Sequence, residues 1–505
     1  MNSLRYIGGL TMVNLFTEDH MRNLPTIRLA EIVLENFKSV KYGKIVLNCG
    51  KKHIPYGTKA DILGVYGQNG SGKTALIEAI SILKHLLSGQ SVPSEYADCV
   101  DVESSFSKLS FTFDFQYPEK CEFPTNNDIR KVVYSFKLKR QIVSENVADD
   151  FSSMFTIETS IDDESYSAPK EQVLIYDEIL KVSGLICGEK TQLTPFCDTS
   201  KPNVYFAPIT KSKYLLGELD ENKRIQLGIA KNKSETQAKS FIFARDTLAL
   251  FRQHSNYSVF YQILAELHIW ATLYLFVIDS KSTGIVRLNF MLPVFANRRM
   301  QLVPIGKRFL VSPEAYEDMK KSFSSLSMVL TQIVPGLCID VSDYGTTLTK
   351  DGKNVHIVEL VAKRGNITIP LRGESDGVRK LVSTLNLLIM VYNQQSTTVA
   401  YDEFDAGIFE YLLGEILQVI QSSGKGQFIF TSHNMRPLEV LKKDFIWFTT
   451  TDPNNRYIKL SGLGETNNLR KVYYREIAVH EHYDNLYSET KRNQIISAMR
   501  KAGGE

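Results

Sequence analysis

Residues 67–74 read Gly67-Gln68-Asn69-Gly70-Ser71-Gly72-Lys73-Thr74 and match the pattern G-x-x-x-x-G-K-[ST] at every fixed position. An apolar run at residues 62–66 precedes the stretch, and apolar residues at helical spacing follow it as far as Leu87. Glycines let the backbone wrap its N–H groups around phosphate oxygens, and the start of a helix adds its positive dipole end. The stretch therefore predicts a strand–loop–helix unit that binds a nucleoside triphosphate.

Two side chains of this loop have specific expected roles. Lys73 would reach the β- and γ-phosphates, and the Thr74 hydroxyl would coordinate Mg²⁺. ATP and Mg²⁺ are therefore the expected cofactors. The other loop residues would hold the phosphates mainly through backbone N–H groups, and they are Gly67, Gln68, Asn69, Gly70, Ser71 and Gly72.

A second β-rich run, far downstream, ends in two carboxylates. Residues 397–401 are followed by Asp402 and Glu403. A buried parallel strand would deliver both acids to the carboxyl edge of the sheet. There Asp402 would hold Mg²⁺ through water, and Glu403 would polarise the water that attacks the γ-phosphate. Taken alone, the run also fits a solvated acidic turn, but the phosphate-binding loop favours the catalytic interpretation.

Between these motifs, a turn opens an apolar helix. The turn reads Glu374-Ser375-Asp376-Gly377 and resembles the signature loop of ABC-type ATPases, in the form found in the SMC, RecF and OLD branch. In that family the signature Ser and Gly of one subunit cap the γ-phosphate held by another subunit. The resemblance implies this role for Ser375 and Gly377, and a head-to-tail dimer as the smallest complete unit. An ordinary serine cap with a loop glycine fits the same residues when they are taken alone.

The strand at residues 428–433 ends in His433 and resembles the switch-histidine strand of ABC ATPases. The resemblance implies that His433 senses the γ-phosphate through a hydrogen bond and contributes to catalysis together with Glu403 and Lys73. Asp405 and Gly407 occupy the place of the loop that crosses the dimer interface in this family, although the sequence motif that transporters have in this loop is absent.

The segment before the phosphate-binding loop agrees with this reading. Residues 34–40 include Asn36-Phe37-Lys38-Ser39 and resemble the first-strand segment of SMC and OLD-like proteins. Lys38 would then approach the nucleotide, although an ordinary strand end explains the same residues equally well. For the glutamine that couples nucleotide to the lobe interface in the family, Gln116 is no more than a guess.

The motif order predicts an α/β fold, a P-loop ABC-type ATPase head with a mixed sheet, an antiparallel β lobe and an inserted helical region. No heptad pattern is sustained over several repeats, so a long coiled coil is not expected. Helices are expected to dominate between the β lobe and residue 333, and residues 241–278 are mostly apolar. Within this region, Ser312-Pro313-Glu314 predicts a capped helix start. Four segments are expected. Residues 25–210 would form an N-terminal ATPase lobe, and residues 211–335 a helical insertion that offers an oligomer or partner surface. Residues 336–450 would form a C-terminal ATPase lobe, and residues 451–505 a tail that contacts a partner.

Bulk properties narrow the function classes. A formal net charge of +3 over 505 residues neither demands nor excludes nucleic acid. The six cysteines show no C-x-x-C pairing, which predicts reduced thiols, and His480-Glu481-His482 lacks a third metal ligand. The apolar piece 267–278 is shorter than the ~20 residues that span a bilayer, and no secretory signal begins the chain. We expect a cytoplasmic protein without a membrane domain.

The whole set of motifs resembles a bacterial group of ABC-type ATPases used in anti-phage defence, such as the ATPase subunits of the PARIS and Septu systems. The resemblance implies a sensor and scaffold that holds a nuclease or toxin effector until infection, with a nucleic acid or phage protein as candidate trigger. OLD-like nucleases instead add a metal-binding domain of roughly 100 residues after the ATPase, and fewer residues follow Phe448 here, so a separate effector chain is expected. A RecF-like repair ATPase that clamps DNA is the alternative, and a transporter subunit is disfavoured.

Overall fold

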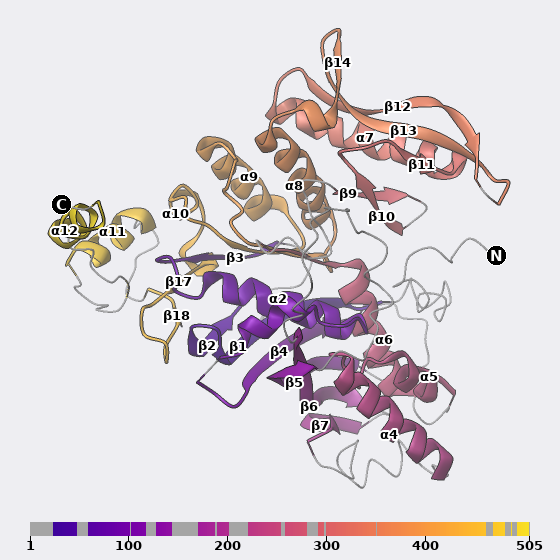
Figure 1. The fold of residues 1–505 in the computed structure, drawn as a ribbon, viewed down its shortest axis with the longest axis vertical. Helices are drawn as coiled ribbons and strands as arrows, with labels where there is room; N and C mark the ends of the chain where they lie inside the picture. The colour runs from indigo at the N-terminus through magenta and orange to yellow at the C-terminus, as the bar shows by residue number, and fades with distance from the viewer. Residues whose placement is uncertain are drawn as a thin grey trace.

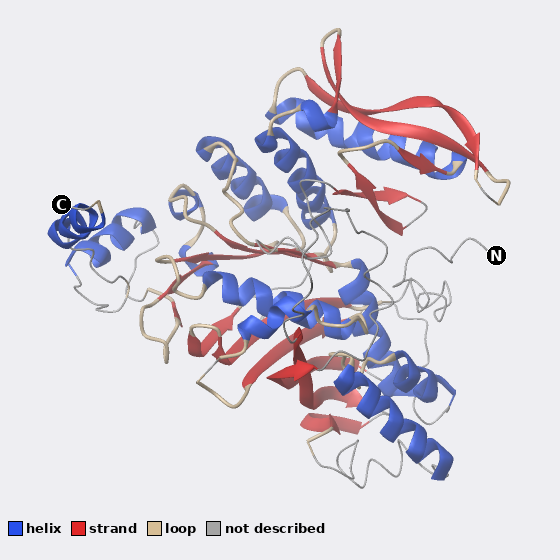
Figure 2. Cartoon of the chain, viewed as in Figure 1, coloured by secondary structure: helices blue, strands red, loops and turns tan. Residues whose placement is uncertain are grey.

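Two six-stranded sheets lie on opposite sides of one buried helix, α2 (Lys73–Leu87), in this computed structural model (Figure 1). Helices α8 (Asp376–Asn393) and α9 (Glu410–Ser423) cover the other face of the first sheet (Figure 2). The described residues are 24–47, 59–101, 103–117, 128–143, 170–186, 189–200, 221–253, 258–279, 291–296, 299–349, 351–460, 468–479, 486 and 492–503.

The first sheet is parallel except at one edge, where its last strand is antiparallel. It carries the strands that lead to the phosphate-binding loop, to the two acids and to His433, with their carboxyl ends at one edge. The strand order is β18 (Tyr457–Ile458), β17 (Ile446–Thr449), β3 (Asp61–Tyr66), β16 (Gln427–Thr431), β15 (Thr398–Tyr401) and β8 (Leu275–Ile278).

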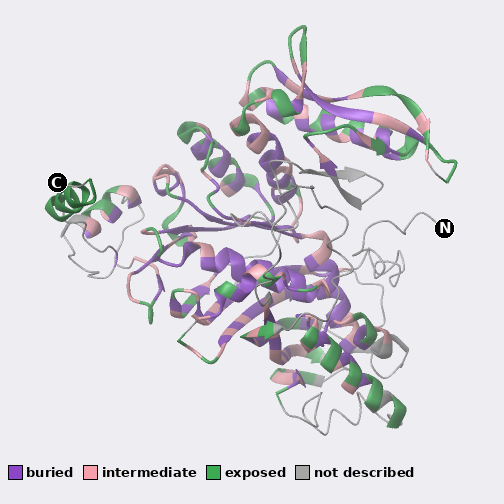
Figure 3. Cartoon of the chain, viewed as in Figure 1, coloured by how far each residue is buried: buried purple, intermediate pink, exposed green. Residues whose placement is uncertain are grey.

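Both faces of this parallel sheet are buried (Figure 3). Alternate residues of β3 enter different hydrophobic clusters, with Leu63 and Val65 on the α2 side and Ile62 and Tyr66 on the other. This alternation is the two-residue period of a strand. It explains why the parallel strands read as nearly continuous apolar runs in the sequence.

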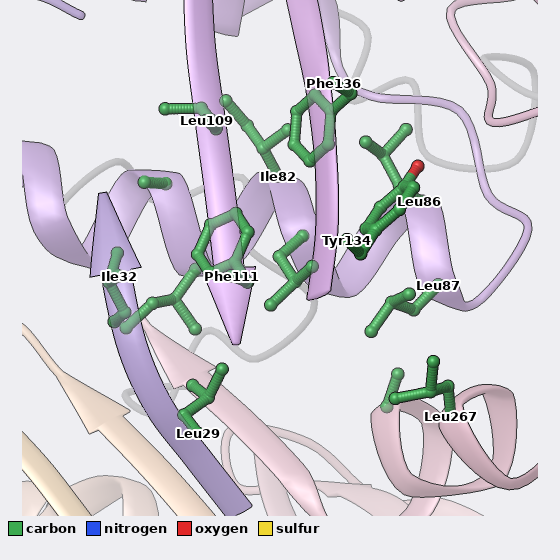
Figure 4. Close-up of a cluster of buried hydrophobic side chains, with 14 of the residues drawn as sticks. Leu29, Ile32, Ile82, Leu86, Leu87, Leu109, Phe111, Tyr134, Phe136 and Leu267 are labelled. Atoms are coloured by element: carbon green, nitrogen blue, oxygen red, sulfur yellow. The ribbon is translucent and has the colours of Figure 1, made fainter. Parts of the chain in front are cut away.

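The second sheet is antiparallel and packs on α2. Phe111 and Leu109 of β4, with Tyr134 and Phe136 of β5, lie over Ile82 and Leu86 of the helix (Figure 4). This confirms the expected antiparallel lobe. The strand order is β2 (Val40–Val46), β1 (Thr26–Phe37), β4 (Ser107–Gln116), β5 (Asp128–Val143), β6 (Lys170–Ile186) and β7 (Glu189–Asp198).

The remaining elements form a helical group beside the antiparallel sheet, an outer β lobe on α7 and a C-terminal pair of helices (Figure 1). Helix α7 starts as predicted, because the Ser312 hydroxyl accepts a hydrogen bond from the Ala315 N–H at 3.3 Å. These elements are η3 (Ser94–Cys99), α4 (Glu221–Thr236), α5 (Arg245–Gln253), α6 (Ser258–Leu273), β9 (Met291–Ala296), β10 (Arg299–Pro304), β11 (Phe309–Val311), α7 (Pro313–Ile333), β12 (Leu337–Leu348), β13 (Asn354–Arg364), β14 (Ile367–Pro370), η6 (Leu371–Gly373), α10 (Pro437–Val440), η7 (Lys443–Phe445), α11 (Leu469–Val479) and α12 (Arg492–Ala502).

One sequence-based expectation needs correction within the apolar stretch 241–278. Helix α6 ends at Leu273, and Leu275–Ile278 forms β8, which pairs in parallel with β15 at the edge of the first sheet. A short apolar run cannot be told from a buried helix by periodicity alone, and only the pairing with β15 decides it. The proposed four-segment division remains a prediction, and its second segment supplies a strand to the ATPase sheet.

None of the helices in the described part combines the length and apolar character that crossing a bilayer needs. Helix α7, with 21 residues, is the longest of them. Three cysteines lie in the described part, Cys99, Cys197 and Cys338, and none of them forms a disulfide there.

Lys84 connects α2 to β8 from a buried position. Its ammonium donates a hydrogen bond to the Leu275 carbonyl at 2.7 Å and lies 5.6 Å from the centre of the Phe276 ring. Burial lowers the pKa of Lys84 from 10.5 to about 8. The charged form is therefore disfavoured in the folded chain, whereas the unfolded chain keeps the ordinary value.

Lys84 should make stability rise with pH. Between about pH 8 and 10.5 the unfolded chain holds a proton that the folded chain has released, so the free energy of unfolding grows with pH. Relative to Lys84→Met, the wild type should gain up to about 1.4 kcal/mol per pH unit across this window. Denaturant unfolding below, within and above the window measures this difference, with the exposed Lys353→Met as control. A difference that stays constant with pH would contradict the assignment.

Candidate nucleotide site

A pocket of about 340 Å³ at the carboxyl edge of the parallel sheet brings most of the predicted site residues together. The parallel register explains this meeting, because it places the ends of β3, β15 and β16 side by side. The pocket is lined by Lys38, Ser39, Asn69, Gly70, Gly72, Lys73, Thr74, Ala75, Asp402, Glu403, Thr431 and His433.

The phosphate-binding loop has the backbone that its glycines predict. Gly67, Gly70 and Gly72 have φ angles of 155°, 76° and 93°, which side-chain-bearing residues rarely adopt. A Cβ atom on Gly67 would lie 1.7 Å from the Thr449 hydroxyl oxygen. Glycine is therefore required at Gly67 both for the backbone angle and for the close approach of β17.

Lys73 is buried inside this loop. Its ammonium donates hydrogen bonds to the Gly67 carbonyl at 2.8 Å and to the Gln68 carbonyl at 3.0 Å. Burial lowers the pKa of Lys73, and the negative charges of Asp402, Glu403 and Asp405 oppose this shift. The lysine is thus held at the centre of the loop, where phosphate oxygens can replace the two carbonyls as its partners.

A hairpin formed by β17 and β18 supports the loop from behind, and the sequence analysis missed it. The Tyr457 hydroxyl donates to the Gly72 carbonyl at 2.7 Å, and the Ser71 hydroxyl hydrogen-bonds the Thr449 hydroxyl. The Arg456 guanidinium donates to the carbonyls of Thr450 and Ser39. No motif marks these residues, because their roles come from the pairing of β17 with β3.

Asp402 lies level with Thr431, because Tyr401 pairs with Phe430 in the preceding register position. One oxygen of its buried carboxylate accepts from the Thr431 hydroxyl at 2.5 Å, and the other, Oδ2, has no hydrogen-bond partner among the described residues. A buried, unpartnered carboxylate oxygen is costly unless a cation or water satisfies it. With the Thr74 hydroxyl in the same pocket, the oxygen donors fit Mg²⁺, which binds oxygen ligands.

Glu403 has an exposed side chain on an unusual backbone. Its φ angle of 50° is left-handed, a conformation that costs of order 1–3 kcal/mol in a residue other than glycine. Its N–H donates to the Thr431 hydroxyl oxygen at 2.8 Å. The Thr431 hydroxyl therefore links the two acids, since it accepts from Glu403 and donates to Asp402.

His433 follows β16 and lies at the rim of the pocket. The Asp405 carboxylate accepts hydrogen bonds from the backbone N–H groups of His433 at 3.3 Å and of Asn434 at 3.0 Å. Within its own chain, Asp405 thus holds the turn that carries the histidine. From the sequence, Asp405 is expected in a loop that crosses the dimer interface, and no motif indicates this contact within the chain.

Lys38 lines the pocket from the turn between β1 and β2, also with a left-handed backbone at φ 51°. Its ammonium forms an ion pair with the buried Glu78 of α2 at 2.6 Å. The residue is therefore near the predicted phosphate site, and its charge is already paired within the chain.

Two predicted binding residues, Ser375 and Gly377, do not line the pocket. Ser375 is exposed and caps α8, where its hydroxyl accepts from the Val378 N–H at 3.3 Å. Gln116 is also outside the pocket, at the exposed end of β4 opposite Thr26, and its coupling role stays a prediction.

His480, Glu481 and His482 lie outside the described residues. Elsewhere in the described part, no group of three or more His, Cys, Asp and Glu side chains is arranged to hold a metal ion. The oxygen donors around Asp402 would therefore bind Mg²⁺ only together with a nucleotide, whose phosphates would complete the ligand set.

Several solved structures are similar to this chain at low sequence identity. The head of an Smc protein bound to the C-winged helix domain of ScpA has a TM-score of 0.41 and 14% identity, covering 86% of this chain and 98% of that one. An SMC head domain from Thermotoga maritima has a TM-score of 0.32 and 11% identity, covering 86% and 99%. The recombination mediator RecF bound to ATP has a TM-score of 0.33 and 13% identity, covering 86% and 100%.

No curated protein sequence matches the chain. A family model does match, over residues 62–439, and its description is "AAA domain, putative AbiEii toxin, Type IV TA system". The matched range begins in the strand before the phosphate-binding loop and ends after the turn of His433, so it contains the whole pocket apart from Lys38 and Ser39. The match covers well over half of the chain, and the chain therefore belongs to this AAA-domain family.

Proposed function

We propose that the chain is an ATP-hydrolysing sensor and scaffold subunit of a bacterial anti-phage defence complex, which controls a separate nuclease or toxin through ATP-dependent, head-to-tail association of subunits. One observation carries the proposal. The pocket contains the phosphate-binding loop, Asp402 and Glu403, whereas Ser375 and Gly377 lie outside it on an exposed helix start. A second copy of the chain would supply these two residues to the pocket.

In the proposed mechanism, the loop N–H groups and Lys73 bind the β- and γ-phosphates. Thr74 and Asp402 would hold Mg²⁺, which neutralises phosphate charge when it is bound. Glu403 orients the attacking water and accepts a proton from it while the γ-phosphoryl group moves to the water oxygen and ADP leaves. His433, at the pocket rim, would hydrogen-bond the γ-phosphate and report its presence.

The positions of the phosphate-binding groups explain how ATP would control the association of two chains. A helix N-terminus, such as the start of α8 at Ser375, attracts anions through its positive dipole end. If that helix contacts the γ-phosphate only in the paired state, ATP favours pairing by the free energy of those contacts. Loss of the γ-phosphate by hydrolysis then removes the contacts and releases the pair.

Two features support the defence context. The family description names a putative toxin and a type IV toxin–antitoxin system. The C-terminal helix α12 has no buried residue, and it exposes Ile495, Ile496 and Met499 on its surface. We assign α12 to contact with the effector, because an apolar helix surface of this kind is stabilised by a partner.

The catalytic assignment predicts different effects for two variants. Glu403→Gln should bind ATP normally, hydrolyse it about 10²–10⁴-fold more slowly and accumulate as an ATP-bound pair, because only proton transfer and water orientation are lost. Lys73→Ala should lose ATP binding, since the central cation of the loop is removed. Steady-state hydrolysis, fluorescent-nucleotide titration and light scattering measure the three properties. Hydrolysis at the wild-type rate by Glu403→Gln would remove the assigned role.

The head-to-tail arrangement predicts complementation in mixed pairs. Ser375→Arg and Lys73→Ala should each be inactive alone, because every site in each homodimer lacks one component. In an equal mixture, each pair that contains both variants has one complete site, formed by Lys73 of one chain and Ser375 of the other, so hydrolysis should return although neither variant is active alone. A mixture that stays inactive although the two variants associate would show that Ser375 does not act across the interface.

The biological role is tested by expressing the chain with its neighbouring genes and purifying it in the presence of ATP and Mg²⁺. We expect a stoichiometric nuclease or toxin on a homo-oligomeric core, lost when α12 is truncated before Arg492. The alternative is a RecF-like repair ATPase that clamps DNA. Recovery of DNA and repair proteins only, with DNA-stimulated hydrolysis that is steeply sensitive to salt, would replace the defence role with that one.

A further inference from the structure

We propose that Lys380, on the signature helix α8, is a positioning residue that holds the backbone of Glu403 in its left-handed conformation. The Lys380 ammonium donates a hydrogen bond to the Glu403 carbonyl at 3.0 Å. Through this bond, the helix that presents Ser375 to a partner also sets the geometry of the acid in its own chain. The inference rests on the proposed role of Glu403 in ATP hydrolysis.

The backbone of Glu403 is held on both sides. Its N–H donates to the Thr431 hydroxyl oxygen, and its carbonyl accepts from the Ala406 N–H at 3.1 Å and from Lys380. Thr431 and Ala406 belong to the same sheet edge and loop as Glu403. Lys380 is the contact that comes from a separate element, so it is the one that a movement of α8 would change.

The surroundings of Lys380 direct its ammonium to this carbonyl. Its nitrogen lies 5.3 Å from the centre of the Tyr401 ring, and it forms no ion pair within the described part of the chain. The neighbouring Arg379 instead pairs with Asp376 at the start of the helix. Burial lowers the pKa of Lys380, and the charges of Asp405, Glu403 and Asp402 oppose this shift. A partly buried ammonium is stabilised by a hydrogen-bond acceptor, and the Glu403 carbonyl provides one.

A second contact joins the same two elements. A Cβ atom on Gly377 would lie 2.9 Å from the Gly407 carbonyl oxygen, so the start of α8 rests directly on the loop that follows Glu403. The helix start therefore cannot shift toward this loop without moving it. Lys380 lies little more than one helical turn beyond the Ser375 cap, so both contacts respond to a displacement of the helix start.

The inference predicts a specific kinetic pattern. Lys380→Met keeps much of the volume of the side chain and removes the donor, so kcat for ATP hydrolysis should fall by about 10–100-fold, because small misplacements of a catalytic group are costly. The KM and the dissociation constant for ATP should stay within about twofold of the wild type, because Lys380 does not line the pocket. Lys380→Arg keeps a donor and should recover most of the rate.

A double-mutant cycle separates positioning from a general structural effect. If Lys380 acts through Glu403, adding Lys380→Met to Glu403→Gln should cause no further loss of hydrolysis. A further loss by the same factor as in the wild-type background would overturn the inference. The exposed Lys353→Met serves as the matched control and should hydrolyse ATP like the wild type.

The outcomes also distinguish this inference from the proposed function. A wild-type chain that binds ATP without hydrolysing it would refute the proposed function itself. A wild-type chain that hydrolyses ATP, with Lys380→Met equally fast, would refute only the positioning role. A Lys380→Met chain that loses ATP binding while Lys380→Arg retains it would also refute positioning, because the defect would then precede the chemical step.

Discussion

The parallel pairing of β16 with both β3 and β15 is the constraint on which the site depends. It places Thr431 beside Asp402 and brings both next to the loop that leaves β3. The Thr431 hydroxyl then hydrogen-bonds the Asp402 carboxylate and the Glu403 N–H. A single hydroxyl at the end of the middle strand therefore sets the arrangement of the two acids, and a slip of one register position would separate all three groups.

The parallel sheet can hold this geometry because it is covered on both faces. Helix α2 lies between it and the antiparallel sheet, and almost every residue of the helix is buried. Such burial fixes the start of α2 and hence the loop that precedes it. The β17–β18 hairpin supports the loop from the remaining side through Thr449, Arg456 and Tyr457, so contacts within the chain hold the phosphate-binding backbone in place.

The two acids and helix α8 differ in how firmly the surrounding structure holds them. Asp402 and Glu403 end a rigid buried strand, whereas α8 begins at an exposed serine that lies outside the pocket. In the proposed function, the rigid strand end would hold the catalytic acids, and the exposed helix start would contact a second copy of the chain. Lys380 and Gly377 join these two parts, so the geometry at the Glu403 backbone depends on where the helix sits.

The local pattern of the sequence determined the phosphate-binding loop, the two-acid strand, the capped start of α7 at Ser312 and the alternation in β4, because neighbours along the chain specify each of them. Tertiary structure alone decided that Leu275–Ile278 is a strand, since its type depends on pairing with β15. It also decided the contacts of Thr449 with Ser71 and of Lys380 with Glu403. Those contacts join residues from separate elements, and no short-range pattern encodes a meeting that depends on how whole sheets and helices pack.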